Sequence, residues 1–218
     1  MRKIILPTLF ILALSFGVFA QSSDVTFEQF KITDVGSISI PSIMELQSGT
    51  YKEFSESLSK DLMKKQGIEI TGDGIIFQQK GLNDFKKVNT YARVIIETTV
   101  GKQGNYGKIT SKPTLTKQEI QYASAILKKQ LEDELKGIGL KIVKWNGVSV
   151  DNVNSRSVMK VAYLRQLNNN PPVYVEILIF ENNDRLHKLT ISYRQQDASI
   201  WEESLRKTKN SFTVTNVK

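Results

Sequence analysis

Short runs of alternating apolar and polar residues mark the first strands that the chain is expected to form. Residues 35–40 alternate along Val-Gly-Ser-Ile-Ser-Ile and are stopped by Pro41, as at the end of a strand. Residues 68–79 are typical of a β-ribbon with a glycine-rich turn. Residues 91–100 are dense in Val, Ile and Thr, and predict a strand of the main sheet.

The second half of the chain has a denser strand pattern. Residues 140–145 predict one strand, which the turn pair Asn146-Gly147 ends. Three more strands follow in series, at residues 155–167, 173–180 and 186–194. Connections of four or five residues indicate antiparallel neighbours. The middle strand of this series is apolar on both faces, so it should lie inside the sheet with a cover on each side.

Three segments have apolar residues at helical spacing. Residues 50–65 begin with a capping-box pattern, Thr50-x-x-Glu53. A second helix begins at Thr116-x-x-Glu119 and is ended by glycines. A third covers residues 198–207, with Asp197 as the expected N-cap. Helices before and after an antiparallel series predict an α+β fold, an α/β/α sandwich with a central, mostly antiparallel sheet.

The N-terminus carries the pattern of a secretory signal peptide. A basic start is followed by an apolar core of about 15 residues, too short to span a bilayer as a helix, and by Val18-Phe19-Ala20. We therefore divide the chain into a signal peptide (residues 1–20), an N-terminal arm (21–33) and one domain (34–218). Cleavage after Ala20 would lower the formal charge from +8 to +6, since Arg2 and Lys3 are removed. No second apolar run of that length follows, so the mature chain is not expected to cross a membrane.

Composition removes several classes of chemistry. The 218 residues contain no cysteine and one histidine. Disulfide scaffolds, thiolate nucleophiles, cysteine-based zinc sites and His-rich metal sites are thereby excluded, and we expect no metal or cofactor. An exported chain without cysteine fits bacterial export, which predicts a periplasmic or secreted protein.

Two segments of the chain resemble a known superfamily. The ending is His187-Lys-Leu-Thr-Ile-Ser-Tyr193, then a helix with Trp201, then Asn210-Ser-Phe212, and it is similar to that of the PsbP-like superfamily. The opening Gly36-Ser-Ile-Ser-Ile-Pro41 is similar to its first strand, and the order of elements matches over about residues 34–214.

The resemblance implies a fold more than a function. The PsbP-like superfamily includes an extrinsic photosystem II protein, a Ran-binding nuclear import factor and many exported bacterial proteins. Its members bind different partners, and the matching segments contain no catalytic or binding residue that could be carried over.

Two residues of the predicted sheet are candidates for chemistry. His187 would have to serve any Ser-His-Asp site, but its strand position favours a partly buried, hydrogen-bonded side chain beside the turn at residues 182–185. Glu176 interrupts the apolar strand at residues 173–180 and could bind a ligand or act as an acid. The alternative is that Glu176 pairs with Lys160 or Arg165 of the neighbouring strand.

Residues 101–113 form a basic, glycine-rich loop. Its spacing does not match a phosphate-binding loop, so a mobile surface loop is the simpler interpretation. Tyr106 lies between Lys102 and Lys108, and these three residues could form a contact patch. Together with Glu176, they are the binding residues that the sequence predicts.

These features favour an exported, non-enzymatic accessory or binding protein that contacts a protein or a cell-envelope component. Export argues against nucleic acid, whereas weak attraction to anionic lipid head groups or acidic wall polymers stays open. One alternative is a hydrolase with two carboxylates facing each other within about 10 Å. Another is a carrier with an enclosed pocket for a small apolar ligand.

Overall fold

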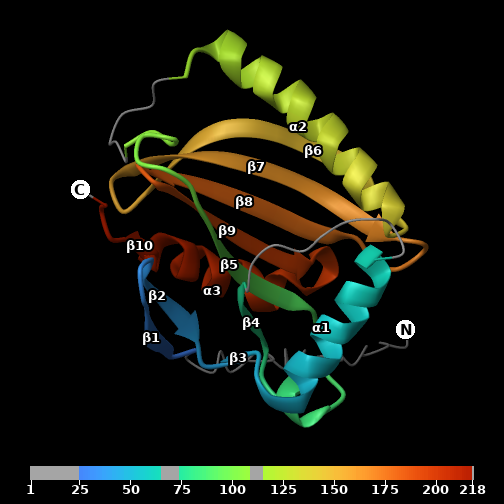
Figure 1. Cartoon of the computed structure of the whole chain (residues 1–218). Helices are drawn as coiled ribbons and strands as arrows, with labels where there is room; N and C mark the ends of the chain where they lie inside the picture. Colours follow the sequence, from blue (N-terminus) through green and yellow to red (C-terminus); the bar gives the residue numbers. More distant parts are fainter. Residues whose placement is uncertain (1–24, 65–73, 109–114, 218) are drawn as a thin grey trace, which may run out of the picture.

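The chain folds around two antiparallel sheets, in a computed structural model that describes residues 25–64, 74–108 and 115–217 (Figure 1). The larger sheet has the strand order β3-β4-β5-β9-β8-β7-β6, and the smaller has the order β1-β2-β10. The strands are β1 (Phe27–Ile32), β2 (Gly36–Pro41), β3 (Met44–Leu46), β4 (Ile75–Gln79), β5 (Ala92–Val100), β6 (Leu140–Val153), β7 (Arg156–Leu167), β8 (Val173–Asn182), β9 (Arg185–Arg194) and β10 (Thr213–Val214). The helices are α1 (Gly49–Lys64), α2 (Lys117–Gly137) and α3 (Ala198–Ser211), with 3-10 turns η1 (Leu82–Asp84) and η2 (Gln195–Asp197).

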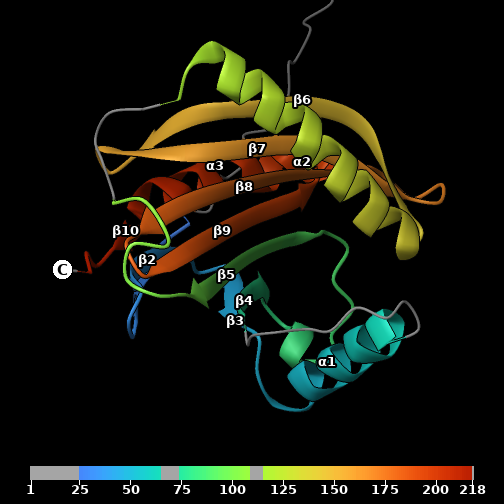
Figure 2. The same cartoon turned by 45° about the horizontal axis from the view of Figure 1, so that its top comes forward.

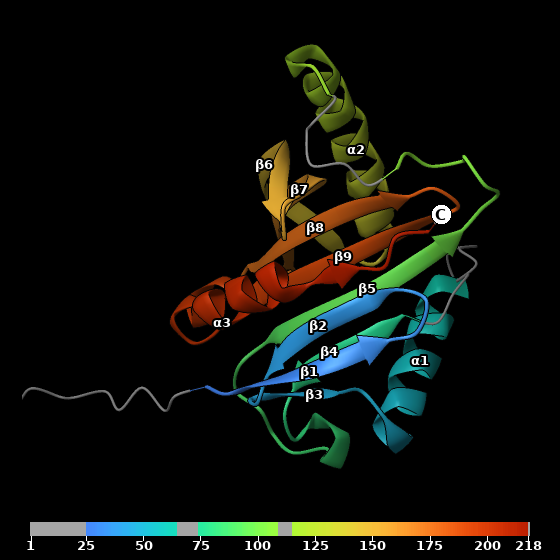
Figure 3. The same ribbon diagram turned by 90° about the vertical axis from the view of Figure 1, so that its left-hand side faces the viewer.

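Helices lie on both sides of the larger sheet. Figure 3 shows α3 on one side and α1 with α2 on the other, and Figure 2 shows α2 lying across β6 and β7. Strand β8 is an inner strand between β7 and β9. Its Leu178 and Phe180 are buried in the core beneath α3, and its Val175 is buried in a second core beneath α2. The predicted α+β sandwich with a doubly covered inner strand is therefore confirmed.

The smaller sheet corrects the predicted N-terminal arm. Residues Phe27–Ile32 form β1 and pair along their whole length with β2, so they belong to the body of the protein. Phe30 packs edge-on against Phe77 of β4, with ring centroids 4.9 Å apart. Phe30 and Ile32 thus pack against the main core, a long-range contact that local periodicity does not reveal.

Strand β6 corrects a predicted turn. It runs through Asn146-Gly147 without reversing, and its register with β7 shifts at Ile142/Lys144 and again at Trp145/Gly147. Gly147 has φ 98°, so the pair forms a bulge instead of a hairpin. The chain reverses seven residues later, at Asn154 and Ser155, which both have positive φ.

Helices α2 and α3 begin close to where the sequence places them, with different caps. Thr116 caps α2 through a complete capping box with Glu119. Asp197 stands at the N-cap of α3 but makes no capping bond, because its carboxylate accepts from the Tyr91 backbone N–H at 3.0 Å. Helix α1 begins at Gly49, one residue before the predicted cap Thr50.

Some predictions fall on parts of the chain outside the described segments. These are the signal peptide at residues 1–20, the first part of the ribbon at residues 68–73 and the end of the basic loop at residues 109–113. Within the described segments, none of the helices combines the length and apolar character needed to cross a bilayer.

Candidate functional site

His187 is a buried structural residue. Its ring is fully buried between two hydrogen bonds, one joining Nδ1 to Thr98 Oγ1 at 2.9 Å and one joining Nε2 to Asn182 Nδ2 at 3.2 Å. An amide nitrogen can only donate, so Nε2 accepts and Nδ1 carries the proton. Burial, with the nearby Arg185 charge, lowers the pKa of His187 to about 4. The ring is neutral at neutral pH, and the sequence-based interpretation of a hydrogen-bonded histidine holds, with complete burial.

Asn182 extends this network to the C-terminal segment. Its Nδ2 also donates to the Thr215 carbonyl at 2.9 Å, and its Oδ1 accepts from the Val217 N–H at 3.0 Å. Strand β10 pairs with β2 just before this segment. The His187–Asn182 pair therefore fastens the end of the chain to the turn between β8 and β9.

The described part of the basic loop, residues 101–108, is docked onto the same turn. The Gly101 N–H donates to the Asp184 carbonyl at 2.6 Å and the Tyr106 N–H to the Asn183 carbonyl at 3.0 Å. In turn, the Asn183 N–H donates to the Gly107 carbonyl, and the Asn183 Oδ1 accepts from the Gly104 N–H, both at 3.0 Å. These bonds hold the backbone of residues 101–108 in place, which differs from the predicted mobile loop.

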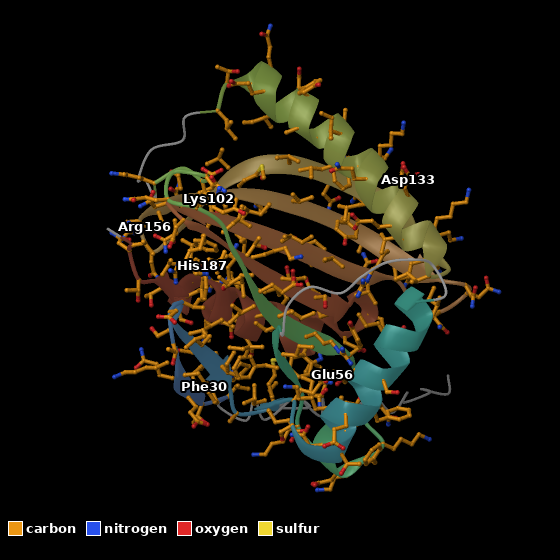
Figure 4. All side chains as sticks on the ribbon, viewed as in Figure 1. Phe30, Glu56, Lys102, Asp133, Arg156 and His187 are labelled. Carbon is orange, nitrogen blue, oxygen red and sulfur yellow. The ribbon has the colours of Figure 1, made fainter. Side chains whose placement is uncertain are left out.

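Several connections gather at this end of the sheet, which we call the loop end. It comprises residues 101–108, the β8–β9 turn at Asn183–Asp184, the β1–β2 turn at Asp34 and the C-terminal residues 215–217. Arg185 joins two of them, because it pairs with Asp184 and donates to the Asp34 carbonyl. In Figure 4 the labelled Lys102, Arg156 and His187 lie toward this end of the strands.

Two of the predicted binding residues are available at the loop end. Lys102 and Lys108 are exposed, and within the described segments neither side chain has an ion-pair partner. Tyr106 is half-buried and its ring packs near Gly101, where an added Cβ would lie 3.2 Å from it. The loop end thus exposes the side chains of Lys102 and Lys108 on a backbone that hydrogen bonds hold in place.

Glu176 lies in a different place, on the face of β8 beneath α3. It is mostly buried, with Oε2 accepting from the Tyr174 hydroxyl at 2.8 Å and Oε1 lying 3.0 Å from Lys209 Nζ. The contact between Lys209 Nζ and Oε1 is an ion pair whose angles do not suit a hydrogen bond, so Oε1 accepts no hydrogen bond from the described residues. The partner is thus Lys209 of α3, instead of the predicted Lys160 or Arg165.

Lys209 and Glu176 belong to a larger charge network. Lys209 Nζ also lies 3.0 Å from Asp151 Oδ2, which is 3.4 Å from Lys160 Nζ. Burial alone would raise the pKa of Asp151, but the hydrogen bonds from Lys209 and from the Asn152 backbone N–H, together with both lysine charges, outweigh it, so the pKa is lowered. Burial would also lower the pKa of Lys209, but the hydrogen bonds and charges of Asp151 and Glu176 outweigh burial, so the pKa of Lys209 is raised. The network fixes α3 on β6–β8 by paired charges.

A cleft of about 450 Å³ opens beside this network, between α3 and the sheet. Its lining residues are Lys144, Asn146, Leu164, Tyr174, Glu176, Ile191, Tyr193, Gln195, Glu202, Leu205, Arg206 and Lys209. Burial, then the charges of Glu202 and Glu176, raises the pKa of Tyr193 to about 12, so its phenol stays protonated. With cations, carboxylates and amides in its walls, the cleft differs from the apolar pocket that a carrier of an apolar ligand would need.

The four predicted binding residues therefore divide between two sites. Lys102, Tyr106 and Lys108 lie at the loop end, while Glu176 lies seven residues along the strand from Asn183, about 23 Å away. Sequence reasoning missed most of the cleft, because its walls come from four strands, the 3-10 turn η2 and one helix. The Asn146-Gly147 motif is visible in the sequence, but it predicts a turn where the structure has a bulge.

The described residues offer no evident metal centre. Among them, no group of three or more His, Asp or Glu side chains could hold a metal ion. The two carboxylates of the cleft come from opposite walls, and one of them, Glu176, is already engaged by Lys209 and Tyr174.

Comparison with known proteins gives the fold a name. No protein-family model matches the chain, and no curated protein matches its sequence. The solution structure of cyanobacterial PsbP from Synechocystis sp. PCC 6803 superposes with a TM-score of 0.51 at 13% identity, over 92% of this chain and 99% of that one. A Pseudomonas aeruginosa protein of unknown function, PA94, matches with a TM-score of 0.45 at 11% identity, over 88% and 99% of the two chains. The order and pairing of its elements, together with the superposition on cyanobacterial PsbP, show that the chain has a PsbP-like fold.

Proposed function

We propose that the protein is an exported, non-enzymatic accessory protein that binds a partner in the periplasm or outside the cell. The signal-peptide pattern of residues 1–20 supports export. The single histidine supports a non-enzymatic role, since it is buried, neutral and bonded at both nitrogens. The partner is a protein or a cell-envelope component.

The observation that carries this proposal is the construction of the loop end. Residues 101–108 are bound to the β8–β9 turn by backbone hydrogen bonds, and the C-terminal segment is bound to the same region through Asn182. A surface that is already ordered loses little conformational entropy when it binds. The loop end is thus a pre-formed binding surface.

The free cations at the loop end indicate the charge of the partner. Lys102 and Lys108 are exposed, and neither forms an ion pair with a carboxylate of the described segments. Such charges speed association with an acidic surface and favour it over a basic one. The proposed partner therefore presents acidic groups, and anionic envelope surfaces would be attracted weakly in the same way.

A charge-reversal variant tests the proposal. The double variant Lys102→Glu/Lys108→Glu and the control Lys87→Glu/Lys129→Glu change the net charge equally, and all four lysines are exposed. Each protein is used as bait in native envelope extract, and captured proteins are identified by mass spectrometry. We expect a specific acidic partner to be lost with the loop-end variant and kept with the control. Equal recovery by both variants would refute the loop end as the contact surface.

A further inference from the structure

The Asn182 side chain, at the end of β8, connects the buried His187 ring to the C-terminal segment. Its Nδ2 donates to His187 Nε2 at 3.2 Å and to the Thr215 carbonyl at 2.9 Å, and its Oδ1 accepts from the Val217 N–H at 3.0 Å. Both N–H donors of the amide are thereby used. Asn182 is 2% exposed and His187 is fully buried, so the contact between them is closed to bulk water.

Two backbone groups fix the orientation of this amide. A carbonyl can only accept and an N–H can only donate, so the Thr215 carbonyl requires the amide nitrogen and the Val217 N–H requires the amide oxygen. The nitrogen therefore also faces His187, and Nε2 must be the unprotonated nitrogen of the ring. Nδ1 carries the proton and lies 2.9 Å from Thr98 Oγ1. The attachment of residues 215–217 and the protonation state of the ring thus depend on one amide.

A proton on Nε2 is incompatible with this arrangement. The charged ring has an N–H donor at each nitrogen, and the one on Nε2 would point at the N–H donors of Asn182 Nδ2. Turning the amide over would give that donor an oxygen, but it would also place oxygen against the Thr215 carbonyl and nitrogen against the Val217 N–H. No orientation of the amide therefore satisfies the charged ring and both backbone groups. A buried charge without an acceptor is the costlier alternative, so the backbone bonds are the ones that give way.

None of the described carboxylates is placed to take over as the acceptor. Burial and then the charge of Arg185 lower the pKa of His187, and the charge of Asp184 opposes them, but Asp184 pairs with Arg185 at 2.7 Å. Asp34, in the β1–β2 turn, acts on Arg185. Residues 215–217 carry no charged side chain. The charged residues next to the ring and its partners on β5, β8 and β9 are one position out of phase and point to the opposite face of the sheet: Glu97, Glu181 and Lys188.

We propose that His187 and Asn182 form a proton-operated latch: protonation of the His187 ring turns the Asn182 amide and releases residues 215–217 from the end of β8. At neutral pH the ring is neutral and the latch is closed. When acid opens it, β10 stays in place, because the Thr215 N–H donates to the Val35 carbonyl at 2.8 Å and β10 pairs with β2. The released residues belong to the loop end, so acid alters that surface. The latch does not depend on the proposed function, since a proton is the only ligand that it needs.

Hydrogen exchange at two backbone amides separates the latch from a general loosening of the fold. The protection factors of the Val217 and Thr215 N–H groups are measured by NMR in the purified full chain, from about pH 6.5 to about pH 4.5. Protection of Val217 should fall by at least about tenfold over this range, because an opening that takes up one proton gains up to about tenfold per pH unit. Protection of Thr215, whose N–H is bonded to Val35, should change by less than about threefold.

Two results of this experiment would overturn the proposal. An equal loss of protection at Val217 and Thr215 would mean that all of β10 loosens, so that the Asn182 amide is not the element that moves. Constant protection of Val217 over the whole pH range would mean that residues 215–217 stay attached whatever the state of the ring.

Two variants test the part of each side chain. His187→Gln introduces an amide that does not titrate, so protection of Val217 should no longer depend on pH. Asn182→Asp introduces a carboxylate, which can accept from the Val217 N–H and from the charged ring together, so acid should no longer release Val217 and the pKa of His187 should rise. The measurement on the native chain decides the question even where a variant fails to fold. Loss of Val217 protection in His187→Gln equal to that in the native chain would refute the part of His187.

Discussion

The buried, neutral His187 makes a quantitative prediction about acid stability. In the folded protein its pKa is about 4, whereas an unfolded histidine titrates at 6.5. Between these values the unfolded chain binds a proton that the folded chain does not, so the free energy of unfolding falls as the pH is lowered. Above pH 6.5 both states are neutral, and below pH 4 both are protonated, so this contribution changes only within that window.

The size of the effect follows from the pKa difference. Each pH unit within the window costs about 1.4 kcal/mol, so lowering the pH from about 7.5 to about 5 should reduce the free energy of unfolding by about 2 kcal/mol. Most carboxylates remain ionised at about pH 5, which isolates the histidine. Urea denaturation can be followed by the fluorescence of Trp201, which is 2% exposed in the folded protein.

A variant and a spectrum separate His187 from other groups. His187→Gln should be less stable at neutral pH but should lose little further stability down to about pH 5. Since His187 is the only histidine, one NMR titration reports its pKa and its tautomer, which should be protonated at Nδ1. An equal loss of stability in the native protein and the variant, or a measured pKa above about 6, would refute the reasoning.

Three further substitutions test how the fold is held. Leu178→Ala should leave a cavity in the core under α3 and cost about 3 kcal/mol in urea denaturation; a loss below about 1 kcal/mol would contradict its complete burial. Lys209→Met should cost about 2 kcal/mol, because Glu176 and Asp151 lose their cation, and this cost should shrink where both acids are protonated. Thr116→Ala should cost about 1 kcal/mol and speed hydrogen exchange in the first turn of α2, and unchanged exchange would argue against the cap.

Features set by neighbouring residues could be predicted from the sequence. The capping box of α2 needs only Thr116 and Glu119, three residues apart, and the structure contains it. Strand β8 has apolar residues on both faces, a pattern that requires two covers wherever the strand lies, and the structure covers it twice. Local chemistry dictates both features.

Features set by distant residues could not be predicted. Asn146-Gly147 is a strong turn signal, yet the pairing of β6 with β7 continues past it and turns the pair into a bulge. The partner of Glu176 is Lys209, 33 positions away, and only the placement of α3 on the sheet brings them together. The cleft depends on the same placement, so no local pattern could reveal it.

Site-specific photocross-linking tests the central claim that the protein works by binding a partner at its loop end. A photoreactive residue replaces Lys102 in one protein and Lys129 of α2 in another, and both are illuminated in native envelopes. We predict a discrete adduct to one partner from position 102 and none from position 129. Matching adducts from both positions, or none from position 102 in the compartment where the protein resides, would contradict the account.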